Sequence, residues 1–392
     1  MNPMITTAAA PAGLRPSALA VVLDRRRPGR IPYAPNYWQW FAHQRNHGLL
    51  PTAIAGCPDQ LALIRWLGLD VFSRNLYCDE QRGWFGGLTE AVHDGIEFCE
   101  REWFEGRDRV TERTYRTRAG DLSERLRYVF AESTLVQEKF LVTDFPRELD
   151  ALAALLEARR WRFQPDRYEA WREHVGDDGQ VIAGELYSPL KLLHLVAGPV
   201  ETTYLLTDHP ERARELLALH EAAMLDLVRQ MAHAGVRVVM AMDNLDSSFH
   251  PPRLVEQCSA SFYEQASRLC HASGSLFFIH ACGRQRVNLG RIASYGVDGL
   301  EGVAFPPLGD VELEEAMRLS GDRMILTGGI SAAGFQRLHT RAEVFGYVND
   351  LFRRMTPFVH RFILSASCST PYTAPWETLL HFRDAWREYG TL

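Results

Sequence analysis

Three residues with soft, metal-binding side chains follow apolar runs in the second half of the chain. His280 and Cys282 end the run at residues 276–282, and Cys368 follows the run at residues 362–364. Residues two apart in a strand point to the same face, so His280 and Cys282 present an imidazole and a thiol together. One imidazole and two thiolates suit zinc better than a hard ion that prefers oxygen. A buried cysteine is also often only a small apolar residue, and that interpretation of Cys282 stays open at this point.

The elements that must position these residues alternate between short apolar segments and amphipathic helices. Eight strands are expected, centred on Ile31, Val71, Val181, Val238, Phe278, Val297, Ile325 and Ile363. Eight strands that alternate with helices through right-handed crossovers predict a closed (β/α)8 TIM barrel of the α/β class, forming a single domain over residues 1–392. An open doubly wound sheet is the alternative, but no glycine-rich dinucleotide turn follows the first strand.

Two segments depart from this alternation. Residues 1–29 form an N-terminal extension, in which residues 16–23 predict a short helix. Residues 86–143 alternate apolar and charged side chains between turn sequences such as Glu105-Gly106-Arg107-Asp108, which predicts an inserted region of antiparallel β-hairpins. Alternating charges of this kind are typical of a solvated face, so no site residue is assigned to this insertion.

The composition excludes several classes of protein. The chain has 392 residues, 46% hydrophobic and 23% charged, with a net charge of −6 that gives no reason to expect a nucleic-acid partner. Its 7 cysteines are scattered and odd in number, which favours a reducing, cytoplasmic setting over a disulfide framework. We expect no secretory signal, because residues 1–20 lack a basic region followed by a long apolar core, and no apolar run approaches the roughly 20 residues that span a bilayer. We therefore expect no membrane association.

In a TIM barrel, catalytic groups stand at the carboxyl ends of the strands. His280 and Cys282 end the fifth expected strand and Cys368 follows the eighth, so all three should meet at one mouth of the barrel. Glu301 follows the sixth strand, where it would be a fourth metal ligand or only a carboxylate at the start of a helix. Asp243 follows the fourth strand and is a competing oxygen ligand or a partner that orients His280. The sequence thus predicts a zinc site with Asp243 and Glu301 as the candidate catalytic carboxylates.

Four further residues are expected to bind the substrate: Tyr33, Trp38, His250 and Tyr372. Trp38 belongs to an aromatic segment at residues 37–41, which we expect to be a loop that either packs on the core as a lid or walls a pocket. His250 precedes a predicted helix near the same mouth. A pocket lined by these rings would suit an apolar or aromatic ligand.

Together these features resemble the uroporphyrinogen decarboxylase-like superfamily, and within it the zinc-dependent, corrinoid-linked methyltransferases. The resemblance extends from about residue 26 to the end of the chain. It rests on Arg30-Ile31-Pro32, Gly198-Pro199, Gly328-Gly329-Ile330 and Ser367-Cys368-Ser369-Thr370-Pro371, and most specifically on His280-x-Cys282 with Cys368 far downstream. True decarboxylases lack this zinc signature. They carry an arginine-rich substrate loop where this chain has Asn36-Tyr37-Trp38-Gln39-Trp40.

The resemblance implies transfer of a methyl group between a corrinoid and a thiol or similar acceptor. Zn²⁺ held by His280, Cys282 and Cys368 would bind the acceptor thiol as a thiolate, and Glu301 would be displaced if it fills the fourth position. The chain contains no Asp-x-His-x-x-Gly corrinoid loop. The corrinoid (cobalamin) is therefore expected on a partner protein or free, and a homodimer is also considered.

Three other functions remain open at this stage. Relatives with the same zinc signature add a thiol to an epoxide, so the electrophile need not be a methyl group. Tetrapyrrole decarboxylation is a second alternative, with Asp243 as the candidate acid. The third is a barrel that binds a small ligand without catalysis and holds a purely structural zinc, in a closed site of four protein ligands.

Overall fold

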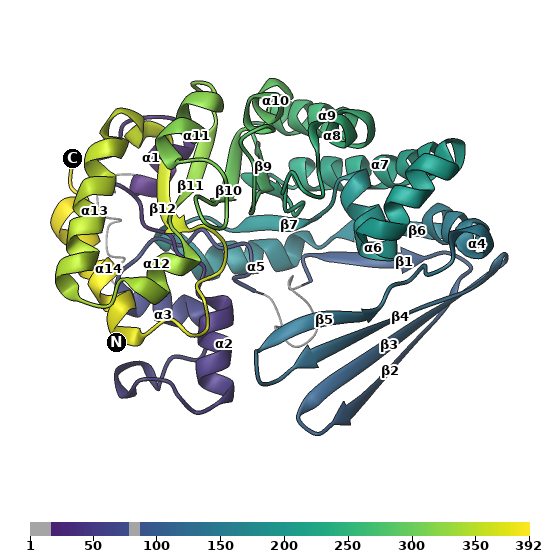
Figure 1. Cartoon of the computed structure of the whole chain (residues 1–392), viewed down its shortest axis with the longest axis horizontal. Helices are drawn as coiled ribbons and strands as arrows, with labels where there is room; N and C mark the ends of the chain where they lie inside the picture. The colour runs from purple at the N-terminus through teal and green to yellow at the C-terminus, as the bar shows by residue number, and fades with distance from the viewer. Residues whose placement is uncertain (1–16, 78–86) are drawn as a thin grey trace, which may run out of the picture.

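A parallel sheet of six strands forms the centre of the fold in this computed structural model, which describes residues 17–77 and 87–392 (Figure 1). Its order is β12-β11-β10-β9-β8-β7, so neighbours in the chain are neighbours in the sheet. The strands are β7 (Ile182–Leu186), β8 (Val238–Ala241), β9 (Leu276–His280), β10 (Gly299–Val303), β11 (Ile325–Ile330) and β12 (Phe362–Ala366). Residues 1–16, Cys78 and residue 86, which belong to the expectations above, lie outside the described residues.

Two short extended segments join the first strand of this sheet to the last. Tyr33 forms a parallel bridge with Leu364 of β12. The backbone N–H of Asp70 donates to the carbonyl of Tyr33 at 2.9 Å, and the N–H of Val71 donates to the carbonyl of Asp178, ahead of β7, at 2.9 Å. Six strands and two bridging segments thus form one ring of backbone hydrogen bonds, and the predicted α/β TIM barrel is confirmed.

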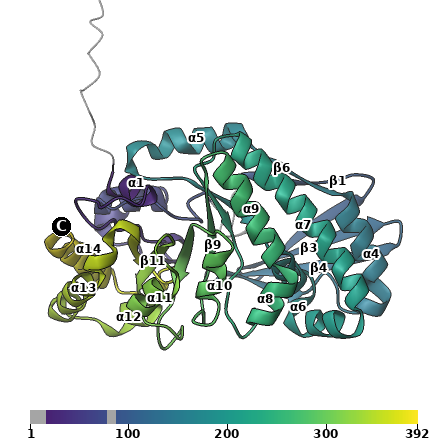
Figure 2. The ribbon, with the colours of Figure 1, turned by 90° about the horizontal axis from the view of Figure 1, so that it is seen from above.

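Helices cover the outside of the sheet, with α7 and α9 side by side along one flank (Figure 2). The helices that follow strands are α6 (Pro189–Asp208), α7 (Pro210–His233), α8 (Pro252–Cys258), α9 (Ala260–Ala272), α10 (Leu289–Ser294), α11 (Leu313–Leu319), α12 (Ala332–Arg337), α13 (Arg341–Met355) and α14 (Trp376–Tyr389). Within the described residues, no helix has both the length and the apolar character that crossing a bilayer requires.

The N-terminal half contributes α1 (Ala18–Leu23), α2 (Trp38–Asn46), α3 (Gln60–Leu67), α4 (Phe145–Ala158) and α5 (Pro165–Val175), with short 3₁₀ turns at Thr52–Ile54 and Gly176–Asp178. A third 3₁₀ turn, Thr356–Arg361, directly precedes β12. The prediction of a loop at the aromatic segment is therefore wrong, because Trp38 begins a helix. Trp40 is buried and stacks on Trp376 of α14 at 5.7 Å between ring centroids. That packing holds the segment in helical form despite its many aromatic residues.

The antiparallel insertion predicted from the hairpin pattern is confirmed as a sheet of order β2-β3-β4-β5 (Figure 1). Its strands are β2 (Glu97–Glu105), β3 (Asp108–Thr117), β4 (Gly120–Val129) and β5 (Thr134–Lys139). A further pair, β1 (Thr89–His93) and β6 (Arg159–Phe163), was not predicted, because its partners lie 66 or more residues apart in the chain. One face of the four-stranded sheet packs through Tyr115 and Leu122 onto an apolar cluster that includes residues of α4 and α6.

The sequence pattern placed two strands too early, those that form β10 and β11, and the shift of β10 matters for the site. We expected the sixth strand to end before Glu301, whereas β10 runs through this residue and pairs Glu301 with His280 of β9. Glycine explains the error, since it usually marks turns rather than strands. Here Gly299 lies against the ring of Phe278, and Gly328 lies against the carbonyl of Val303, where a Cβ would come within 2.8 Å.

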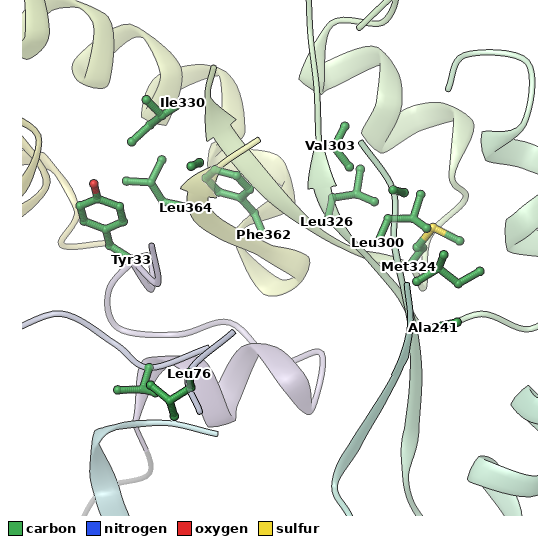
Figure 3. Packing of buried hydrophobic residues seen from close by; sticks show 14 of the residues in the cluster. Tyr33, Leu76, Ala241, Leu300, Val303, Met324, Leu326, Ile330, Phe362 and Leu364 are labelled. Carbon is green, nitrogen blue, oxygen red and sulfur yellow. The ribbon is translucent and has the colours of Figure 1, made fainter. Parts of the chain in front are cut away.

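Apolar side chains fill the space between the sheet and its helices (Figure 3). Leu326 and Leu300 from adjacent strands pack on one side of the close-up, and Leu364, Phe362 and Tyr33 on the other. All five are 0–1% exposed. Near the start of β12, α1 buries Leu19, Val22 and Leu23 in a second apolar cluster, which also contains Ile325 and Ile363. The result is a rigid support for the loops at the carboxyl ends of the strands.

Candidate metal centre at the barrel mouth

His280, Cys282 and Cys368 come together although 88 residues separate the first from the last. His280 is the last residue of β9, and Cys368 stands two residues beyond the end of β12. Their ligand atoms all lie within 4.8 Å of one another, and Cys368 Sγ is 3.9 Å from His280 Nε2. Among the described residues, this is the one group of three or more histidine, cysteine or acidic side chains with metal-binding spacing.

Gly302 allows the close approach on which this cluster depends. It follows Glu301 in β10 and adopts φ +89°, a conformation that L side chains rarely tolerate. A Cβ at this position would lie 2.9 Å from the carbonyl oxygen of Ser367 and 3.0 Å from Cε1 of His280. A larger residue would therefore push against both sides of the centre at once.

Glu301 orients the imidazole of His280 rather than joining the ligand group. His280 Nδ1 donates a hydrogen bond to Glu301 Oε2, which leaves Nε2 directed toward Cys368. A carboxylate on the far nitrogen is the usual partner of a metal-binding histidine, because it fixes the tautomer and raises the basicity of the ligand. The structure therefore places Glu301 behind the ring, where the sequence had suggested a fourth ligand.

Arg74 is the counter-ion of Glu301, and it was not among the site residues predicted from the sequence. Its Nη1 lies 2.7 and 2.8 Å from the two carboxylate oxygens, and its Nη2 lies 3.6 Å from Cys368 Sγ. Burial by itself would raise the pKa of Glu301, but Arg74 and His280 outweigh it and lower that pKa. The sequence does contain a signal for Arg74, because it comes three residues after Val71, the centre of an expected barrel strand. Functional residues of barrels gather at the carboxyl ends of such strands.

The two thiols are not equivalent. A hydrogen bond from Cys282 holds the pKa of Cys368 well below its usual range, with help from His280 and Arg74. The same hydrogen bond raises the pKa of Cys282 well above its usual range. A thiolate is the form of cysteine that binds metals, so Cys368 is prepared as a ligand. Two sulfurs and an imidazole whose other nitrogen is already paired form a donor set that fits zinc.

Asp243 does not reach this centre. Its Oδ1 accepts from the backbone N–H of Ser188 at 2.9 Å, and its Oδ2 accepts from the hydroxyl of Tyr263 at 2.5 Å. The carboxyl group is fully buried, and burial raises its pKa. Asp243 therefore connects the loop after β7 to α9, and the orienting role that the sequence offered it is filled by Glu301.

A cavity of about 200 Å³ opens beside the metal-binding residues. It lies between the carboxyl ends of the barrel strands, the start of α2 and the edge of the antiparallel sheet. The residues that line it are Trp38, Gln39, Arg74, Asn75, Thr134, Tyr187, Lys191, Leu195, Met242, Asn244, His280, Cys368 and Ser369. Trp38, expected as a substrate-binding residue, is among them, and so is Thr134 from the insertion to which the sequence assigned no site residue.

The other three expected substrate-binding residues lie away from the lining of this cavity. Tyr33 is 0% exposed in the barrel core, and its hydroxyl oxygen lies 3.4 Å from the hydroxyl oxygen of Tyr37. His250 is buried with its ring against His194, 5.0 Å between centroids. Tyr372 packs on His43 at 4.5 Å. Their aromatic character was correctly noted, but only tertiary packing distinguishes a core ring from a pocket wall.

Lys191 and Asn244 are cavity residues that the sequence analysis overlooked. Lys191 stands in the first turn of α6 between leucines, and a charged residue in such an apolar stretch is a detectable signal. Asn244 adopts φ +48°, and its N–H donates to the carbonyl of His280 at 3.0 Å. A non-glycine residue in this left-handed conformation often marks a functional loop, but the conformation is not visible in a sequence.

Comparison with known proteins finds one matching family and one solved structure of similar fold. The profile of the uroporphyrinogen decarboxylase (URO-D) family matches residues 143–389. A methyltransferase from Methanosarcina mazei is similar at 14% identity, with a TM-score of 0.53, over 95% of this chain and 97% of that one. A D-psicose 3-epimerase from Clostridium cellulolyticum H10 is more distant, at 10% identity and a TM-score of 0.35, over 59% of this chain and 86% of its own. No curated protein sequence matches the chain.

Proposed function

The chain belongs to the uroporphyrinogen decarboxylase family, and within it we propose a zinc-dependent methyltransferase that acts between a corrinoid and a thiol acceptor. The proposal rests on one observation above all: His280, Cys282 and Cys368 present their ligand atoms within 4.8 Å, and two of them line an open cavity. The likeness in fold to a methyltransferase agrees with it.

Zinc, when bound by these three residues, would supply a Lewis acid with one exchangeable position that holds an acceptor thiol as its thiolate. Transfer of a methyl group to this thiolate needs no additional oxidant or reductant. A corrinoid, when docked, would supply the methyl group: the sulfur–carbon bond would form as the carbon–cobalt bond breaks, so that methylcobalt(III) and a thiolate would give a methyl thioether and cobalt(I). The electron pair of the carbon–cobalt bond would stay on cobalt.

The protein's own residues would prepare the thiol site. Glu301 holds the proton on His280 Nδ1 and so keeps Nε2 free for the metal. Arg74 neutralises Glu301, which prevents an unpaired carboxylate from competing for the metal. Asn244 fixes the carbonyl of His280 and thereby the end of β9. Such preorganisation lowers the cost of reaching the reactive geometry.

The size of the cavity suggests how a corrinoid would be presented. A volume of about 200 Å³ has room for a small thiol but not for a corrinoid macrocycle. The corrinoid would therefore stay at the rim, on a partner protein or free, with its methyl group directed inward. Trp38 of α2 and Thr134 of β5 both line the cavity, so its wall includes a residue of the antiparallel sheet.

The alternatives have less support in the geometry. A decarboxylase that uses Asp243 as its acid would need that carboxyl group in the cavity, whereas both its oxygens are bonded elsewhere. A structural zinc would need a fourth protein ligand, and Glu301 is occupied by Arg74 and His280. Addition of the thiol to an epoxide uses the same centre and is separated by experiment.

The test uses zinc-loaded protein, methylcobalamin and 2-mercaptoethanol. We expect loss of the methylcobalamin spectrum, formation of cob(I)alamin and formation of the methyl thioether. His280→Ala should abolish this reaction, and Cys99→Ser, which changes an exposed cysteine on β2, should not. Consumption of 1,2-epoxypropane in place of methylcobalamin would assign the epoxide reaction instead, and a zinc that excludes thiols would disprove both.

A further inference from the structure

We propose that Asn36 is a positioning residue of the metal centre, whose side-chain amide holds the loop that carries Arg74 and the loop that carries Cys368 in one fixed relation. Asn36 is 1% exposed and is not one of the residues that line the cavity, so it would act through its neighbours rather than on a substrate. The inference rests on the proposed function only in requiring that a metal binds at His280, Cys282 and Cys368.

Asn36 uses both ends of its amide to fix the loop of Arg74. Its Oδ1 accepts a hydrogen bond from the hydroxyl of Ser73 at 3.0 Å, and its Nδ2 donates to Oδ1 of Asn75 at 2.9 Å. The backbone N–H of Asn75 donates in turn to Oγ of Ser73 at 3.3 Å, which closes a ring of three hydrogen bonds. All three residues are buried, and hydrogen bonds in a buried network reinforce one another. Arg74, which lies between Ser73 and Asn75 in the chain, is therefore held from both sides.

The same residue also fixes the loop of Cys368. The backbone carbonyl of Asn36 accepts from the N–H of Thr370 at 2.9 Å, and its Nδ2 lies 3.5 Å from Oγ of Ser369. These two residues directly follow Cys368 in the chain. Arg74 and Cys368 are 294 residues apart, yet Nη2 of the arginine lies 3.6 Å from Sγ of the cysteine. Because Asn36 is bonded to both loops beside these two residues, it sets that distance.

Asparagine suits this position because its amide has both a donor and an acceptor. An ionised aspartate could accept from Ser73 but could not donate to Asn75, and leucine, of similar size, could do neither. Either change would leave a buried polar partner without its hydrogen bond, which costs more than the bond itself contributes. The two loops would then relax, and Arg74 and Cys368 would lose their fixed separation.

Three residues of the cavity wall also depend on this amide. Asn75 and Ser369 line the cavity, and so does Trp38, whose backbone N–H donates to Oδ1 of Asn36 at 3.5 Å where α2 begins. One buried side chain thus connects three parts of the wall to the loops of the metal centre. A change at Asn36 should therefore alter how the metal is held, although it removes neither a ligand nor a wall residue.

The experiment measures cobalt(II) binding to the whole chain and to its variants by competition with a chelator. Asn36→Leu should weaken cobalt binding about 10-fold, the lower end of the usual effect of a group that orients a metal ligand. Asn36→Asp keeps the bond from Ser73 and should lose less. The matched control is Asn46→Ala, which removes an amide on α2 that donates to Tyr128 at 2.9 Å and should leave the cobalt affinity unchanged.

The sulfur-to-cobalt charge-transfer band separates positioning from folding. Looser placement of Cys368 should weaken this band per bound cobalt in Asn36→Leu, and the band should not change in Asn46→Ala. Ser73→Ala removes another member of the ring and should lower the cobalt affinity in the same direction, so it carries the test if Asn36→Leu fails to fold. A lower urea midpoint with an unchanged band and unchanged affinity would overturn the proposal, because the amide would then only stabilise the fold.

Two further outcomes distinguish this role from the proposed function. Weaker cobalt binding in the Asn36 variants, together with a wild-type protein that does not demethylate methylcobalamin, would refute methyl transfer and retain the role of Asn36. A wild-type protein without any sulfur-to-cobalt band would refute the metal centre and this role together.

Discussion

Glu301 and His280 lie directly opposite each other on the neighbouring parallel strands β10 and β9, and the carboxylate accepts the hydrogen of the imidazole Nδ1. Both side chains are 3% exposed. Strand register alone brings them together, so the orientation of the metal-binding nitrogen depends on the sheet rather than on a flexible loop. Arg74, from the N-terminal part of the chain, extends this pair to Cys368.

Replacement of Glu301 should weaken metal binding without removing any ligand. Loss of a carboxylate behind a metal-binding histidine typically costs about 10- to 100-fold in metal affinity. We expect a loss of about 100-fold for Glu301→Ala and about 10-fold for Glu301→Gln, whose amide oxygen can still accept from His280 Nδ1. Competition with a chelator measures the affinity. Unchanged zinc affinity in both variants would show that Glu301 does not orient the ligand.

The buried ion pair of Arg74 and Glu301 should be costly to break on one side only. Arg74→Met leaves a carboxylate without its guanidinium in a buried site, which should cost about 3–5 kcal/mol in the free energy of unfolding. The double variant Arg74→Met/Glu301→Gln removes both charges and should recover most of this loss. Urea unfolding of the single and double variants measures the effect.

An exposed pair provides the control for that comparison. Arg172 and Glu169 on α5 are hydrogen-bonded, with side chains 59% and 48% exposed. Arg172→Met should leave the urea midpoint nearly unchanged, because water screens the pair. A similar loss at both positions would mean that burial of Arg74 is not the cause.

Gly302→Ala should disturb the centre through backbone and ring contacts. The added Cβ would meet the carbonyl of Ser367 and the ring of His280 at a backbone φ of +89°. Strain of this kind costs about 1–3 kcal/mol, and we expect bound zinc to fall with it. Gly346→Ala is the matched control, since that glycine lies within α13 and an added methyl group would have no atom within 4 Å. This control should be neutral or stabilising by up to about 1 kcal/mol, and zinc content should not change.

His250 should make the protein less stable in acid. Burial lowers its pKa to about 3, with smaller contributions from His194 and Lys191, and neither ring nitrogen has a hydrogen-bond partner among the described residues. An unfolded histidine has a pKa of about 6.5, so the unfolded chain takes up the proton first as the pH falls. The stabilising contribution is complete above about pH 6.5 and is lost toward pH 3, at about 1.4 kcal/mol per pH unit.

His250→Phe should therefore flatten the dependence of stability on pH. Between about pH 6.5 and 4.5, unfolding of the variant should take up about one proton fewer than unfolding of the wild type. Urea midpoints measured across this range give the slope. An unchanged slope would mean that His250 is already protonated, or accessible to water, in the folded protein.

The barrel and its three soft ligands could be predicted from the order of residues alone. Periodicity identifies buried parallel strands because their apolar runs are continuous, and in a barrel all carboxyl ends share one mouth, so His280, Cys282 and Cys368 could be brought together in advance. The antiparallel insertion followed from its own period of two.

The surroundings of these ligands depend on contacts that only the folded chain makes. The roles of Glu301 and Arg74 depend on the register of β10 against β9, and Gly299 and Gly302 concealed that strand because glycine reads locally as a turn. Tyr33 and Trp38 look alike in sequence, yet packing buries the first in the core and places the second on the cavity wall. Local pattern specifies elements, whereas contacts between distant segments specify which side chains meet.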